Sequence, residues 1–73
     1  MTPARRLLTA DDPAAELRAM RRDDPVAAVL DLPRTMAPGP DGVWLCNAGG
    51  EMGLGRTEAD AVRDWARRME GEA

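Results

Sequence analysis

The sequence of 73 residues lacks His, Lys, Ser, Tyr, Phe, Ile and Gln, which removes most of the usual catalytic and metal-binding side chains. With no His and a single cysteine, a zinc site is excluded. That cysteine, Cys46, cannot form a disulfide within the chain, which suits a reducing compartment. We therefore expect a protein that is not an enzyme and needs no cofactor or metal.

Long apolar runs are absent too. The first residues contain an Arg pair but no apolar stretch behind it, so they predict neither a signal peptide nor an anchor. No segment approaches the roughly 20 apolar residues of a membrane span, and we expect a cytoplasmic protein that does not bind membranes. The net charge of −3 argues against direct binding to nucleic acid, which requires clustered basic charge.

The length predicts one small domain over residues 1–73, with a core too small for high stability. We expect residues 1–10 to be a flexible N-terminus from which Leu7 and Leu8 dock. Asp12 followed by Pro13 is typical of a helix start, and the helix should reach about Arg22. Its apolar face would consist of Ala14, Leu17 and Met20.

A second Asp-Asp-Pro triplet lets Asp24 cap another element, but residues 26–32 fit two interpretations. As a helix, this segment places Val26, Val29 and Leu30 on one face. As a strand, the segment places every second residue on one face and would support the hairpin that follows. The cap favours the helix. Residues 33–42 are rich in Pro and Gly and predict a loop.

Residues 43–70 predict a β-hairpin followed by an amphipathic helix. Gly49-Gly50 suits a two-residue turn, since both residues tolerate positive φ. This turn pairs Leu45 with Leu54 on one face of the hairpin. On the other face, it sets two residues of the first strand opposite glycines of the second, pairing Trp44 with Gly55 and Cys46 with Gly53.

The C-terminal helix should begin after Thr57, with Asp60 three residues on as in a capping box. Its apolar face would hold Val62, Trp65, Ala66 and Met69, and Asp64 can pair with Arg68 one turn later. The fold class is therefore α+β. We expect a hairpin, extended to three antiparallel strands if residues 26–32 pair with it, packed by this helix, with one or two N-terminal helices.

The segment from Gly50 to Thr57 matches the phosphate-binding pattern G-x-x-x-x-G-K-[ST], except that Arg56 replaces Lys. Known loops of this kind belong to larger parallel α/β domains, so we favour a turn, a strand and a helix cap. Cys46 has no His to act as its base. A lone cysteine in an apolar strand is more often a small packed hydrophobe.

The same C-terminal segment resembles the strand–strand–helix unit of the HicB-type antitoxin family. That family has an aromatic first strand, a Gly-containing second strand and a G-x-T-x-x-E/D-A helix start. The resemblance implies an antitoxin-like or regulatory module that pairs with a small protein partner. The matching residues here are Trp44, Gly53, Gly55, Thr57, Asp60 and Ala61.

The overall profile also resembles small phage-borne inhibitors of host defence, the anti-CRISPR proteins, which are often short, acidic chains without a catalytic site. Together with the missing catalytic side chains, the acidic balance and the two Trp residues, this resemblance leads us to expect a protein-binding inhibitor that occludes a basic, nucleic-acid-handling surface of a larger host protein or ribonucleoprotein complex. We expect the inhibitor to be a monomer or homodimer. A Trp anchor and acidic side chains would make the contact. The candidate contact residues are Trp44, Asp41, Glu51, Glu58, Asp60 and Asp64.

Overall fold

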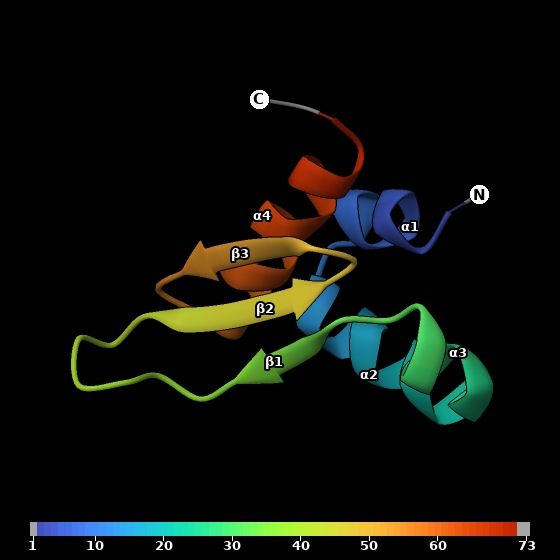
Figure 1. Cartoon of the computed structure of the whole chain (residues 1–73), viewed down its shortest axis with the longest axis horizontal. Helices are drawn as coiled ribbons and strands as arrows, with labels where there is room; N and C mark the ends of the chain where they lie inside the picture. The colour runs from blue at the N-terminus through green and yellow to red at the C-terminus, as the bar shows by residue number, and fades with distance from the viewer. Residues whose placement is uncertain (1, 72–73) are drawn as a thin grey trace.

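The computed structural model describes residues 2–71, which pack around one core (Figure 1). Four helices and a three-stranded antiparallel sheet of order β1-β2-β3 make up the fold, so the α+β prediction is confirmed. Helix α4 lies across one face of the sheet, and α1 and α2 pack against α4. The elements are α1 (Pro3–Thr9), α2 (Pro13–Asp23), α3 (Pro25–Leu30), β1 (Arg34–Met36), β2 (Trp44–Ala48), β3 (Glu51–Gly55) and α4 (Glu58–Met69).

Side-chain caps fix the starts of three helices where the sequence predicts them. The carboxylate of Asp12 accepts the Ala15 N–H at 3.3 Å, and Thr57 Oγ1 accepts the Asp60 N–H at 3.1 Å. Asp24 caps α3 in the same way, which confirms the helical interpretation of the segment after it. Each cap satisfies a backbone donor that has no partner inside its own helix.

Two segments carry more regular structure than their composition predicts. In place of a flexible segment over residues 1–10, α1 forms, because Thr2 caps it and Leu7 is completely buried against the core. The Pro/Gly-rich loop over residues 33–42 begins with strand β1, which pairs with β2 through Thr35 opposite Cys46. The third strand therefore comes from this segment, since α3 takes the residues before it.

The hairpin register is confirmed: Leu45 pairs with Leu54, and Cys46 pairs with Gly53. Gly49 and Gly50 have φ angles of +61° and +81°, as the turn requires. The sequence left open which face α4 covers. It covers the glycine face, because a Cβ on Gly53 would lie only 2.3 Å from the backbone N of Trp65.

The core lies between this glycine face and the helices. Trp65 is 1% exposed, and its indole Nε1 donates to the Ala48 carbonyl of β2 at 3.1 Å. Trp44, on the same face of the sheet, is half-buried and packs against the core. None of the helices described within residues 2–71 covers the opposite face of the sheet, which is turned toward the viewer in Figure 1.

Candidate protein-binding surfaces

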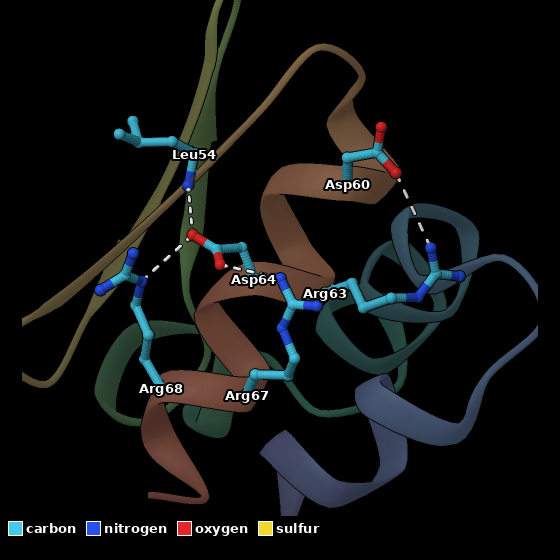
Figure 2. Close-up of polar contacts among 6 residues, drawn as sticks. All are labelled: Leu54, Asp60, Arg63, Asp64, Arg67 and Arg68. Atoms are coloured by element: carbon cyan, nitrogen blue, oxygen red, sulfur yellow. Dashed lines mark hydrogen bonds and ion pairs between the residues drawn. The ribbon is translucent and has the colours of Figure 1, made fainter. Parts of the chain in front are cut away.

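The acidic residues at the start of α4 are held by arginines of the same chain. Glu58 accepts hydrogen bonds from Arg18 of α2 and from the Thr35 hydroxyl of β1, the latter at 3.2 Å. Asp60 pairs with Arg63 at 3.7 Å, three residues along the helix (Figure 2). These side chains connect α4 to its neighbours, and their charges are largely balanced locally.

Asp64 joins α4 to the outer edge of β3, as Figure 2 shows. Its carboxylate accepts the Leu54 backbone N–H at 3.0 Å and also pairs with Arg67 at 3.0 Å and Arg68 at 3.1 Å. The Leu54 hydrogen bond is the main reason that the pKa of Asp64 is lowered. Burial acts in the opposite direction as the second-largest effect, and the bonds from Arg67 and Arg68 lower the pKa further. An edge donor of the sheet is thereby occupied, which discourages pairing with another strand there.

The other three predicted contact residues are spread along the hairpin and the loop before it, and Trp44 lies nearest to these acids because its partner Gly55 packs against Asp60. Asp41 sits in the loop before β2, where its Oδ1 accepts the Val43 N–H at 3.2 Å. Glu51 is exposed at the other end of the hairpin, opposite Ala48. Trp44 is half-buried on the helix-covered face. The structure therefore does not bring the six predicted residues together on one surface.

Sequence reasoning missed a surface on α3. Val26, Val29 and Leu30 are 67%, 76% and 73% exposed, although the helical spacing that places them on one face was visible in the sequence. Because α3 contributes no buried residue to the core, this face stays open to solvent. Exposed Asp24 and Asp31 flank this face, which we call the α3 face.

A second apolar surface covers the sheet on the side away from α4. Met36, Met52 and Leu54 are 52%, 50% and 45% exposed, and Leu45 lies between β1 and β3 on the same side. We call these four residues the open sheet face. Met36, Leu45 and Leu54 line a depression of ≈ 380 Å³ that also reaches Asp41.

Neither chemical motif in the sequence forms a reactive site. Cys46 is 0% exposed, and burial, with a smaller effect of the Glu58 charge, raises the pKa of its thiol to about 12. The segment that matches the phosphate-loop pattern forms β3 and the residues that lead into α4. Gly53 and Gly55 are paired with β2 and pressed against α4, and Thr57 serves as the helix cap. This segment does not form a cradle around an anion.

Within residues 2–71, no group of three or more His, Cys, Asp or Glu side chains is arranged to hold a metal ion. None of the helices described for this part of the chain is long and apolar enough to span a bilayer. Comparison with protein-family models, curated proteins and solved structures finds no match to the chain. The surfaces described above are therefore the basis for a functional assignment.

Proposed function

We propose that this chain acts by binding another protein and covering part of its surface, without catalysing a reaction. The α3 face carries the proposal. Its three aliphatic side chains are each at least 67% exposed and follow the i, i+3, i+4 spacing of a helix that inserts into an apolar groove. Isolated exposed aliphatic residues are common, but three adjacent ones on one short helix are typical of a binding surface.

The charges around the α3 face indicate the kind of groove. Asp23, Asp24 and Asp31 are exposed at the two ends of the helix. Of the nearby arginines, Arg21 is turned inward and donates to the carbonyls of Ala28 and Pro33, at 3.3 and 3.0 Å. Arg22 is exposed and pairs with Asp23 at 3.6 Å, so Asp24 and Asp31 supply the acidic charge around the face, which complements a groove with a basic rim.

This surface supports the partner suggested by the sequence, a basic, nucleic-acid-handling region of a larger complex, as in anti-CRISPR-like inhibition. The acids that would face that partner are Asp24 and Asp31, which cap the two ends of α3, because Asp23, Glu58, Asp60 and Asp64 are paired with arginines of their own chain. The buried, protonated thiol of Cys46 supports a role without covalent chemistry.

The test begins with the tagged protein as bait in a host lysate, followed by purification of the captured partner and measurement of its affinity. Replacing Val29 and Leu30 together by Asp should weaken that affinity at least about tenfold, because burying two carboxylates in an apolar groove is costly. Ala15→Asp, an exposed change on α2, is the matched control and should bind like the unaltered protein.

A second variant tests the electrostatic part. Replacing Asp23 and Asp31 by Arg should slow association with a basic partner and reduce its dependence on salt. Unchanged binding by both double variants would contradict the proposal, as would turnover of any small compound by the purified protein. Capture of a small protein encoded beside this one would favour the antitoxin-like alternative.

A further inference from the structure

The side chains of the open sheet face are arranged in a regular pattern, which those of the α3 face are not. The register places Met36, Leu45 and Leu54 side by side in one row that crosses β1, β2 and β3. All three side chains point away from α4, because α4 covers the opposite, glycine-bearing face. The row is apolar along its whole length and is partly exposed to solvent.

Opposite charges lie on the two sides of this row. Arg34 precedes Met36 by two residues in β1, or roughly 7 Å at the rise of an antiparallel strand. Asp41 is anchored to the N–H of Val43, which precedes Leu45 by two residues and lies just before β2. Since β1 and β2 are antiparallel, the arginine lies on one side of the row, and the carboxylate is bonded to a backbone N–H on the other side.

We propose that the open sheet face binds a second copy of this chain, with a two-fold axis running along the Met36–Leu45–Leu54 row. Rotation about this axis lays the row on itself and exchanges its two sides. Arg34 of each copy then faces Asp41 of the other, so two ion pairs flank an apolar centre. Such self-complementarity is what an isologous interface requires, and aligned sheets pack face to face in this way.

The size of the face sets the strength of the dimer. Three strands spaced about 4.8 Å apart, with at most five residues each, give a patch much smaller than the ~800 Å² per partner of a standard stable interface. The dimer should therefore be weak and depend on concentration. Sedimentation velocity should detect the 7.9 kDa monomer at low concentration and a species of about twice that mass as the concentration approaches the millimolar range.

A charge exchange tests the geometry. Arg34→Asp and Asp41→Arg should each weaken dimerisation about tenfold, and the double variant should recover it. The recovery has to come from contacts between copies, because the two residues lie on opposite sides of the row within one chain. Circular dichroism checks that each variant is folded. A double variant that dimerises no better than the single ones would overturn the proposed arrangement.

Disulfide trapping provides a test that does not depend on the affinity. Leu45 lies on the proposed axis, so Leu45→Cys should form a disulfide with its own copy under mild oxidation. Val29→Cys is the matched control, since Val29 is more exposed but lies on α3. The proposal fails if the unaltered protein stays monomeric near millimolar concentration, or if the two cysteine variants cross-link at the same rate.

Discussion

Gly53 of β3 lies directly against Trp65 of α4, so close that a Cβ on the glycine would come within 2.3 Å of the Trp65 backbone N and 2.4 Å of the Ala61 carbonyl O. The contact allows the helix axis to approach the sheet backbone, and the indole of Trp65 can then reach the Ala48 carbonyl. Because Gly53 has no side chain, Trp65 can take its place in the core of the fold.

Gly53→Ala should destabilise the protein by about 3 kcal/mol, because the backbone of α4 would have to move to make room. Urea unfolding followed by tryptophan fluorescence measures the change. Gly39→Ala is the control, since its Cβ would meet Asp41 at an ordinary 3.5 Å. We expect that variant to stay within about 0.5 kcal/mol of the unaltered protein. Equal losses for the two variants would contradict the close packing of α4 on β3.

Asp64→Asn should reduce stability at pH 7 by roughly 1–2 kcal/mol, because an ionised acceptor of three hydrogen bonds becomes a neutral one. The pKa of Asp64 is lowered by folding, so its contribution is complete above the ordinary value of 3.8 and is lost as the pH falls through the lower folded value. Between pH 5 and about 2, the variant should therefore lose less stability than the unaltered protein.

Asp60→Asn is the control for this pH effect, since its carboxylate is 55% exposed and makes a longer ion pair with Arg63. Exposed pairs of this kind contribute about 0–1 kcal/mol. Thermal unfolding followed by circular dichroism across the acid range gives the comparison. The interpretation of Asp64 as a clamp on the edge of β3 is wrong if both variants show the same dependence on pH.

Cys46 should resist thiol reagents as long as the protein is folded. Its side chain is 0% exposed and its pKa is about 12, so only about one thiol in 10⁴ would be ionised at pH 8. The rate of reaction with a disulfide reagent should therefore follow unfolding and rise steeply with urea. As a control, Asn47→Cys in a Cys46→Ala background places a thiol at the exposed neighbouring position, which should react rapidly without urea.

Arg21→Met should loosen α3 and cost about 1–2 kcal/mol, because the carbonyls of Ala28 and Pro33 would lose a charged donor. Hydrogen exchange should speed up over residues 25–33 more than in α4. Arg22→Met is the control, since that side chain is 76% exposed and pairs with Asp23 at 3.6 Å. Uniform exchange changes along the chain would show that Arg21 does not position α3 specifically.

Much of the local structure follows from the sequence alone. Asp12, Asp24 and Thr57 mark helix starts because each can accept a backbone N–H three residues on. The Gly49-Gly50 turn fixes the whole register of β2 on β3, since strand pairing has a period of two and a shift by one residue would exchange the faces. These features depend only on residues close together in the chain.

The candidate surfaces, in contrast, depend on contacts between distant segments. Three residues are enough for β1 only because β2 supplies a hydrogen-bonding edge, and α1 is held by burial of Leu7. The same packing on the glycine face leaves the Met36–Leu45–Leu54 row uncovered and directs arginines onto the acids of α4. Local preferences thus determined α2, α3, α4 and the hairpin. Tertiary packing alone decided which apolar and acidic side chains stay exposed, because exposure is set by what the rest of the chain covers.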